Sequence, residues 1–506
     1  MLQQNLYNEN NRYVKWQLKN KKDFIAIDIL LILLAIMEIL VLSKYKVLSD
    51  IGLIVITILQ VAIGLKWRNV IKTNQDKKKL VITARIKRLI VTTTILYLLP
   101  VLLIKNIWLF TTIEVAMSYL NPLIVLIAMF INMPIEKLVY LHFKTKAQKK
   151  LKGMNKLKII GITGSYGKTS SKNILSDILN IKYNALPTPR NLNTYNGLIM
   201  TVNNYMDKFT DIFIAEMGAY VRGEIAGLCK LVKPKYGILT RIGTAHLESF
   251  GSEENIIKGK FELIESLPSD GFAVLNGDDE KQLNYKLKNK VKTIWIGIDN
   301  KDVDVRATNI KYSNKGSSFD VIFKGDSKKY HFETKLLGNH NVYNILAAIA
   351  CGREFDIDIS DLEMAVKNVK PVEHRLELKK LGNFYQIDDA YNSNPVGAEN
   401  ACKILGMMPG TKVVVTPGMI ELGEKEDEYN KIFGEQIAKV ADIAILIGEK
   451  KTQPIKEGLL TSGFDKDKIV VFNDVRDAYP YISNLALNEE VYALFENDLP
   501  DTYNEN

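Results

Sequence analysis

The chain has 506 residues, a formal net charge of +10 and 47% hydrophobic residues. This length exceeds that of one ordinary domain and is enough for about three. Much of the basic excess lies beside apolar segments, which favours membrane lipids over nucleic acid as the partner. The three cysteines form no C-x-x-C pair, which argues against a zinc ribbon or a disulfide framework.

Four apolar runs in the first 150 residues approach the roughly 20 residues that span a bilayer. They cover residues 24–43, 51–67, 89–104 and 115–134. The flanking segments 11–23, 67–88 and 137–158 are rich in lysine and arginine, and the positive-inside rule places such segments in the cytoplasm. We therefore expect a multi-pass protein of the cell membrane with both termini cytoplasmic. The alternative is a pair of buried hairpins in a soluble protein.

A glycine-rich segment, TGSYGKTS, occupies residues 163–170 between a β-rich run and a run of helical spacing. A loop that joins a strand to a helix can bind phosphate through backbone N–H groups and the helix N-terminus. The standard G-x-x-x-x-G-K-[ST] pattern fails, because its first glycine would fall on Ile162. The alternative is a turn capped by Thr169 or Ser170. The predicted nucleotide-binding residues here are Thr163, Gly164, Ser165, Gly167, Lys168, Thr169 and Ser170.

Three further polar residues follow strand-like or helical runs. Glu216 ends DIFIAE, so we expect it at the carboxyl end of a strand, where ligands of open α/β sheets collect. His246 follows KYGILTRIGTA, and Lys260 lies on a predicted helix. Each has an ordinary alternative: a solvated glutamate, a structural histidine and a solvated lysine.

The variant T-G-[ST]-x-G-K-T-[ST] resembles the phosphate loop of the Mur ligase family, ATP-dependent enzymes that form amide bonds in cell-wall synthesis. Further segments resemble motifs of its D-alanyl-D-alanine-adding, MurF-type branch in the same order. They are RNLNTYNG (190–197), IAEMGAYVRGEI (214–225), AHLESFGSEENIIKGKFEL (245–263), LLGNHNVYNILAAIA (336–350), EHRLE (373–377) and IDDAYNSNP (387–395). The resemblance covers about residues 159–506.

The resemblance implies ATP and Mg²⁺ as cofactors and assigns roles to individual residues. It implies metal ligation by Thr169, Glu216, His246 and a CO₂-derived carbamate on Lys260, with Lys258 as the competing lysine. It implies catalytic roles for Lys168, His246, Lys260 and Asp389, and nucleotide contacts by Asn341, Asn344 and Arg375. It implies substrate contacts by Asn191, Asn193, Tyr391 and Asn392. The alternatives are a helix cap at Asn341 and a turn or cap at the acid pair Asp388–Asp389.

The order of elements predicts three domains. A transmembrane helical domain of about four spans covers residues 1–150, an ATP-binding domain covers 151–372, and a Rossmann-like domain covers 373–506. Strand-like and helical runs alternate in the second and third domains, which predicts an α/β fold for both. For the ATP-binding domain we expect a mostly parallel sheet. We expect the active site in the cleft between the last two domains.

The predicted function is an ATP-dependent ligase that works through an acyl phosphate. By resemblance it adds D-Ala-D-Ala or a similar amine to the carboxylate of a cell-wall precursor. Nothing in residues 1–150 resembles a nucleotide-sugar domain, which leaves two alternatives open. One is a membrane-anchored ligase for a lipid-linked or polymeric substrate, similar to a poly-γ-glutamate synthase. The other is a non-catalytic ATP-binding membrane scaffold.

Overall fold

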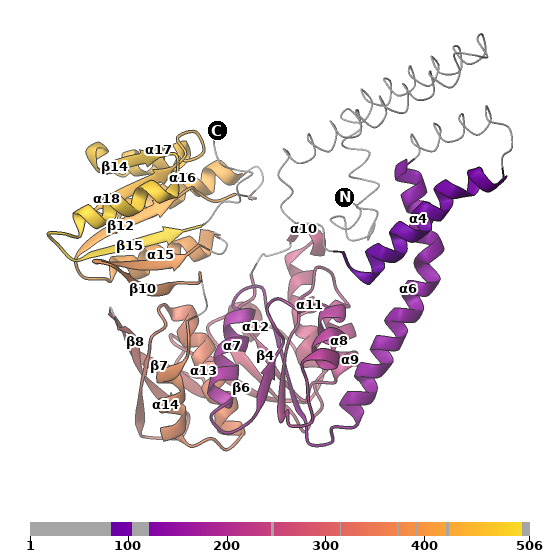
Figure 1. Ribbon diagram of the computed structural model, residues 1–506. Coiled ribbons are helices and arrows are strands. Elements are labelled where there is room, and N and C mark those ends of the chain that lie inside the picture. The colour runs from indigo at the N-terminus through magenta and orange to yellow at the C-terminus, as the bar shows by residue number, and fades with distance from the viewer. Residues whose placement is uncertain are drawn as a thin grey trace, which may run out of the picture. The chain divides into compact units, whose positions relative to one another are not determined.

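The computed structural model describes residues 82–103, 121–243, 247–313, 315–371, 374–390, 393, 395–420, 422 and 425–497 (Figure 1). These residues belong to two compact units that divide at Phe143. The first unit holds helix α4 and most of helix α6, and the second holds both β-sheets. Each unit is described separately below.

Two apolar helices make up the described part of the first unit. Helix α4 spans Ala84–Leu103, and helix α6 begins at Asn121 and continues to Lys152. The Nε atom of Arg88 donates to Glu136 over 2.7 Å, and Thr92 donates to Asn132 over 3.1 Å. Moving four residues forward on α4 thus means moving four residues back on α6, so the two helices pack antiparallel.

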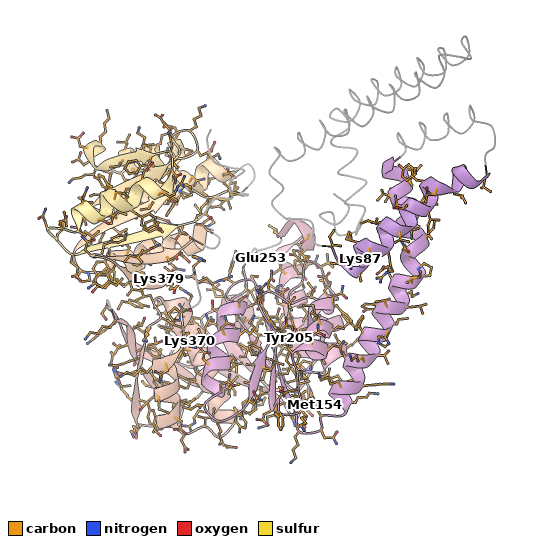
Figure 2. All side chains as sticks on the ribbon, in the orientation of Figure 1. Lys87, Met154, Tyr205, Glu253, Lys370 and Lys379 are labelled. Atoms are coloured by element: carbon orange, nitrogen blue, oxygen red, sulfur yellow. The ribbon has the colours of Figure 1, made fainter. Side chains whose placement is uncertain are left out.

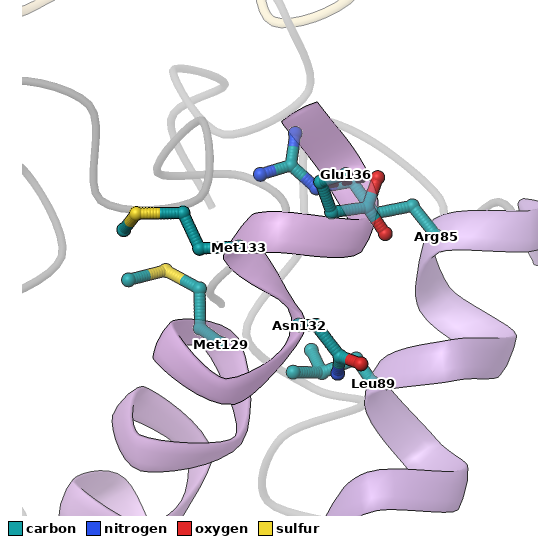
Figure 3. A pocket seen from close by; sticks show the side chains of 6 residues that line it. All are labelled: Arg85, Leu89, Met129, Asn132, Met133 and Glu136. Atoms are coloured by element: carbon teal, nitrogen blue, oxygen red, sulfur yellow. Dashed lines mark ion pairs between the residues drawn. The ribbon is translucent and has the colours of Figure 1, made fainter. Parts of the chain in front are cut away.

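A small cavity of about 100 Å³ lies between these helices, and Figure 3 shows its lining side chains. Arg85 and Glu136 lie on its polar side, and Met129 and Met133 project from α6 on its other side. Large apolar side chains elsewhere on both helices are exposed. On α4 they include Ile90, Val91, Ile95, Leu98 and Leu103, and on α6 they include Leu123, Ile127, Phe130 and Ile131.

The four predicted membrane spans are only partly covered by the described residues. The spans at 24–43 and 51–67 lie outside them, the span at 89–104 falls on α4, and the end of the span at 115–134 falls on α6. Within the described ranges, one helix, Leu123–Lys152, is long and apolar enough to cross a membrane. Helix α6 continues past residue 134, the end of the predicted span, and it carries Pro134 in its interior. The count of four spans stays a prediction.

A nine-stranded sheet forms the core of the second unit. Its strands stand in the order β2-β3-β1-β4-β5-β6-β7-β8-β9, and they are parallel from β2 to β7. The strands are β1 (Lys158–Thr163), β2 (Ala185–Pro187), β3 (Ile212–Glu216), β4 (Tyr236–Leu239), β5 (Phe272–Asn276), β6 (Lys292–Gly297), β7 (Val305–Ser313), β8 (Gly316–Phe323) and β9 (Lys329–Thr334). Strands β7, β8 and β9 pair antiparallel at one edge.

Helices cover both faces of this sheet, and the alternation along each strand explains why. On β1, Ile160 and Ile162 pack against helices α7 (Lys168–Leu179), α13 (Asn339–Glu354) and α14 (Ile359–Asn368). Ile159 faces the other way, toward α8 (Tyr195–Asn204), α9 (Glu224–Val232) and α11 (Glu253–Glu265). Both faces of a parallel sheet are therefore buried, as its hydrophobic strands require. Two short helices, α10 (Leu247–Phe250) and α12 (Glu280–Leu283), complete this layer. Figure 2 shows side chains filling the space between sheet and helices.

A second sheet of six strands follows, in the order β10-β11-β15-β12-β13-β14. Its strands are β10 (Glu377–Leu381), β11 (Phe384–Asp389), β12 (Thr411–Thr416), β13 (Ile443–Ile447), β14 (Ile469–Phe472) and β15 (Val491–Glu496). All pairs are parallel except β10–β11. Its helices are α15 (Pro395–Gly406), α16 (Glu426–Ala438), α17 (Gln453–Thr461) and α18 (Ala478–Leu485). Helices α15 to α17 pack on one face, and α18 packs on the other.

The mostly parallel α/β architecture is therefore confirmed. Every strand-like run that the sequence predicts is a strand: IIGIT, DIFIAE, YGILT, FAVLN and TIWIG in the first sheet, and KVVVTPG, IAILIG, IVVFND and VYALFEN in the second. Strand β2, the β7–β9 edge and the β10–β11 hairpin were not predicted. The strands of the β7–β9 edge and the β10–β11 hairpin alternate polar and apolar residues, whereas the predicted strands are continuous apolar runs. Strand β2 has only three residues. The domain boundaries at residues 150 and 372 and the cleft between the last two domains stay predictions.

Candidate nucleotide and metal site

The glycine-rich loop connects β1 to α7 at the carboxyl edge of the nine-stranded sheet. Gly164 has φ +154° and Gly167 has φ +80°, which side chains rarely permit. A Cβ atom on Gly164 would lie only 1.9 Å from the hydroxyl of Thr240. Gly167 is the N-cap of α7 and makes no side-chain cap, so Thr169 and Ser170 lie inside the helix and the alternative of a capped turn is wrong.

Lys168 begins helix α7, and its ammonium group folds back over the loop. It donates to the carbonyl oxygens of Gly164, over 2.8 Å, and Ser165, over 3.1 Å. Burial lowers the pKa of this lysine, and the nearby Glu216 carboxylate partly opposes that shift. A cation is thus held at the loop and the helix N-terminus, where an anion would bind.

The remaining loop residues fix the backbone. The hydroxyl of Thr163 donates to the carbonyl of Met217 over 2.8 Å, and that of Ser165 donates to Gly243 over 3.0 Å. Ser170 is buried within α7. These contacts join the loop to the segments that follow β3 and β4.

Glu216 is the last residue of β3 and is 1% exposed, so the alternative of a solvated glutamate is wrong. Its Oε1 accepts from Thr169, over 3.2 Å, and from Asn193, over 3.0 Å. The side chains of the predicted metal ligands Thr169 and Glu216 are therefore in direct contact. A hydroxyl and a single carboxylate suit Mg²⁺, which usually takes few protein ligands and completes its shell with phosphates and water.

Lys260 lies on α11 and is 1% exposed, so it is not a solvated lysine. Its Nζ approaches the carbonyl of Ala219 at 3.5 Å and the ring of Phe250 at 5.3 Å. Burial, with a contribution from Lys168, lowers its pKa to about 8. The competing Lys258 is exposed and pairs with Glu254. Burial and a lowered pKa give Lys260 the amine that carbamate formation requires.

The two asparagines of α13 occupy different positions. Asn344 accepts from Ser171 of α7 over 2.9 Å, and its amide nitrogen has no hydrogen-bond partner among the described residues. Its oxygen would lie 3.4 Å from a Cβ on Gly167, so Asn344 lies beside the phosphate loop. Asn341 donates to Leu337 over 2.8 Å, while Gly338 is the N-cap, so the alternative of an Asn341 cap is wrong.

Arg375 and the acid pair belong to the second sheet. Arg375 is half-buried and lies between His374 and Leu376, which both have positive φ. Asp389 ends β11 and accepts from the backbone of Leu376 over 3.1 Å, while Asp388 accepts from His374 over 2.9 Å. The acid pair thus fixes the segment that carries Arg375.

Asp389 also stands beside Glu496 on the neighbouring parallel strand β15. Glu496 is 1% exposed and accepts from Ser393 over 2.6 Å. Burial raises the pKa of Asp389 to about 6, and burial together with the Asp389 charge raises the pKa of Glu496 well above its usual range. Adjacent carboxyl groups in a buried site resist double ionisation.

The roles predicted for four of the site residues stay predictions. His246, Tyr391 and Asn392 lie outside the described residues, and Asn191 is exposed. In the part of the chain that the structure describes, no three His, Cys, Asp or Glu residues form a metal-binding group. Two residues that were not predicted complete the site. The ammonium group of Lys172 lies 3.0 Å from Oε2 of Glu216, and the hydroxyl of Thr240 donates to the loop carbonyl of Tyr166 over 2.7 Å. Lys172 lies one helical turn after Lys168, and that spacing was the available signal.

These features define an α/β protein with a phosphate loop and a second, Rossmann-like sheet. The model of the Mur ligase middle domain matches residues 162–352, and that of the Mur ligase glutamate ligase domain matches residues 374–495. The UDP-N-acetylmuramoyl-tripeptide–D-alanyl-D-alanine ligase of Bacillus subtilis is 32% identical over 63% of this chain and 68% of its own. The corresponding Escherichia coli enzyme is 32% identical over 56% of this chain and 63% of its own.

Solved structures agree with this assignment. MurF from Acinetobacter baumannii is 26% identical, with a TM-score of 0.63, over 71% of this chain and 77% of its own. MurF from Thermotoga maritima in complex with ADP is 27% identical, with a TM-score of 0.60, over 71% of this chain and 80% of its own. The chain belongs to the Mur ligase family and is an ATP-dependent ligase of that family. The match spans about two thirds of the length of the two curated relatives.

The carboxyl pair predicts a pH dependence of stability. Asp389 and Glu496 hold protons to higher pH in the folded state than in the unfolded state. The folded state therefore binds more protons between about pH 4 and 6, and stability falls as the pH rises through that window. We expect calorimetry of the purified protein to show this fall and Glu496→Gln to reduce its slope. Equal slopes in wild type and Glu496→Gln would contradict the pairing, and the exposed Glu449→Gln is the matched control.

Proposed function

We propose that this chain uses ATP to join UDP-N-acetylmuramoyl-tripeptide to D-Ala-D-Ala. The names of its relatives state these two substrates for them. The observation that carries the proposal is the convergence of Lys168, Thr169 and Glu216 at one edge of the nine-stranded sheet. These residues are the parts that phosphoryl transfer to a carboxylate requires. The match with relatives of this named activity supplies the choice of substrates.

The chemistry follows from the weakness of a carboxylate as an electrophile. Transfer of the γ-phosphate of ATP to a carboxylate oxygen releases ADP and gives an acyl phosphate. The amine then attacks the carbonyl carbon, a C–N bond forms, the C–O bond to phosphate breaks, and the amine loses a proton. Lys168 and the loop backbone hold the phosphates in place, which is the main task in phosphoryl transfer.

Thr169 and Glu216 would hold Mg²⁺, which neutralises the phosphate charge when it is bound. The proposed partners of a second ion are His246 and a carbamate on Lys260. The lowered pKa of Lys260, about 8, leaves part of its amine neutral at physiological pH. Only a neutral amine reacts with CO₂, and the product is an anion. The proposed substrate contacts remain Asn191, Asn193, Tyr391 and Asn392. The proposed nucleotide contacts remain Asn341, Asn344 and Arg375.

We also propose that residues 1–150 anchor the enzyme in the cell membrane, with both termini in the cytoplasm. Exposed apolar side chains on α4 and α6 support this, because water is a poor solvent for such faces. The length and apolar character of Leu123–Lys152 add to it. The anchor supports a second candidate function, in which the same chemistry acts on a lipid-linked carboxylate.

The proposed reaction predicts ADP release that requires both UDP-N-acetylmuramoyl-tripeptide and D-Ala-D-Ala. We expect Lys168→Ala to lower the rate by at least about a hundredfold, because a preorganised charge at the transferring phosphate is lost. Lys292→Ala, which removes an exposed ion pair with Glu354, is the control and keeps full activity. Mass spectrometry identifies the joined product. ADP release only with lipid-linked carboxylates would favour the second candidate function. ATP binding without turnover of any pair of carboxylate and amine substrates would favour a non-catalytic scaffold.

The membrane proposal predicts how the full chain leaves native membranes. We expect the protein to stay with the membrane pellet in high salt and at alkaline carbonate pH, and to leave it only in detergent. Salt weakens the attraction of lysines to anionic lipid but does not remove apolar helices from the bilayer. Release of the protein by carbonate alone would contradict the proposed spans.

A further inference from the structure

Lys172 is a buried cation that the proposed reaction does not use. It lies on α7, one turn beyond Lys168, and is 1% exposed. Its ammonium group lies 3.0 Å from Oε2 of Glu216 and donates to the backbone carbonyl of Arg190 over 2.6 Å. A buried lysine is costly unless it is paired and hydrogen-bonded, and these two contacts supply both.

The ion pair gives the two oxygens of Glu216 different surroundings. Oε2 faces Lys172, whereas Oε1 accepts from Thr169 and Asn193. The carboxylate is therefore held in one orientation, with Oε1 toward the hydroxyl of Thr169 in the first turn of α7. Without Lys172, the group could rotate, and its charge would lack its only ion-pair partner within the described residues.

The same ammonium group holds the segment Arg190–Asn193. Arg190 has φ +48°, a conformation that non-glycine residues rarely adopt and that needs support from its surroundings. Asn193 reaches Glu216 through its side chain and accepts from the backbone of Gly218 over 2.8 Å. Lys172 thus joins the carboxylate at the end of β3 to the segment that precedes α8.

We propose that Lys172 is a positioning residue that couples the divalent-cation site to the Arg190–Asn193 segment. It aims Oε1 of Glu216 at the cation and, through the Arg190 carbonyl, holds the segment that carries Asn193. This inference rests on the proposed function, because that function assigns Glu216 to the metal.

A purely electrostatic role and a positioning role predict opposite results for Lys172→Met. If Lys172 acted only as a nearby positive charge, its removal would strengthen Mg²⁺ binding. If it positions Glu216, its removal weakens Mg²⁺ binding by about tenfold or more, as outer partners of metal ligands commonly do. Lys172→Arg restores the positive charge and a donor, so it should recover most of the binding.

The first measurement is calorimetric titration of ADP with and without Mg²⁺ on the detergent-purified full chain. For Lys172→Met we expect ADP affinity without Mg²⁺ to stay within about twofold of wild type, and the gain from Mg²⁺ to fall about tenfold. Lys235→Met, which removes an exposed ion pair with Asp270, is the matched control and should behave as wild type. An unchanged or larger gain from Mg²⁺ in Lys172→Met would overturn the proposal.

The second measurement follows tryptic cleavage within the Arg190–Asn193 segment. Arg190 is exposed, and trypsin can cut after it once the segment leaves its place. We expect Mg²⁺ and ADP to slow this cut in wild type and in Lys235→Met, but not in Lys172→Met. If Lys172→Met fails to fold, the double variant Lys172→Met/Glu216→Gln removes the buried charge and still tests the segment. A wild-type cutting rate in that folded variant would overturn the proposal.

Failure of the metal assignment gives a different result. If ADP binding by the wild type is indifferent to Mg²⁺, both the assignment of Glu216 to the metal and this inference are overturned. If wild type and Lys172→Met depend on Mg²⁺ equally, only the inference about Lys172 is overturned.

Discussion

The site depends on one buried carboxylate, that of Glu216, at the end of the parallel strand β3. A charge in this position is stable only if it is paired and hydrogen-bonded. The chain meets that need with Lys172 and Thr169 from α7 and Asn193 from the segment before α8. Three stretches that are distant in sequence are thereby held together. The phosphate loop, the carboxylate and the asparagine segment form one unit because the buried charge requires all of them.

A second constraint is the closeness of like charges around the phosphate loop. Burial lowers the pKa of both Lys168 and Lys260, and each lysine is affected by charges at the same edge of the sheet. Buried positive charges that lie close together are costly, and the phosphate groups of a nucleotide would offset that cost. The same burial gives Lys260 the reactivity that the family resemblance requires of it. Electrostatics thus prepare the site for an anionic ligand.

The sequence predicted the parts of this protein that local pattern determines. The strand–loop–helix context located the phosphate loop, and the position of Glu216 after an apolar run located it at a strand end. The family resemblance favoured Lys260 over Lys258 for the carbamate, and its burial became evident only in the structure. Lys172 was missed because its importance comes from a contact with Glu216, 44 positions away, and no local pattern encodes that contact. The carboxyl pair Asp389–Glu496 was missed for the same reason, since its two members meet only through strand pairing.

The proposed reaction requires that phosphorylation activates the carboxylate of the substrate at this site. The most direct test uses UDP-N-acetylmuramoyl-tripeptide labelled with ¹⁸O in the reacting carboxylate, with D-Ala-D-Ala and Mg²⁺-ATP. Attack on an acyl phosphate leaves one carboxylate oxygen on the phosphate that departs. We expect one ¹⁸O atom in the inorganic phosphate for each amide bond formed. Product formation with unlabelled phosphate would contradict it.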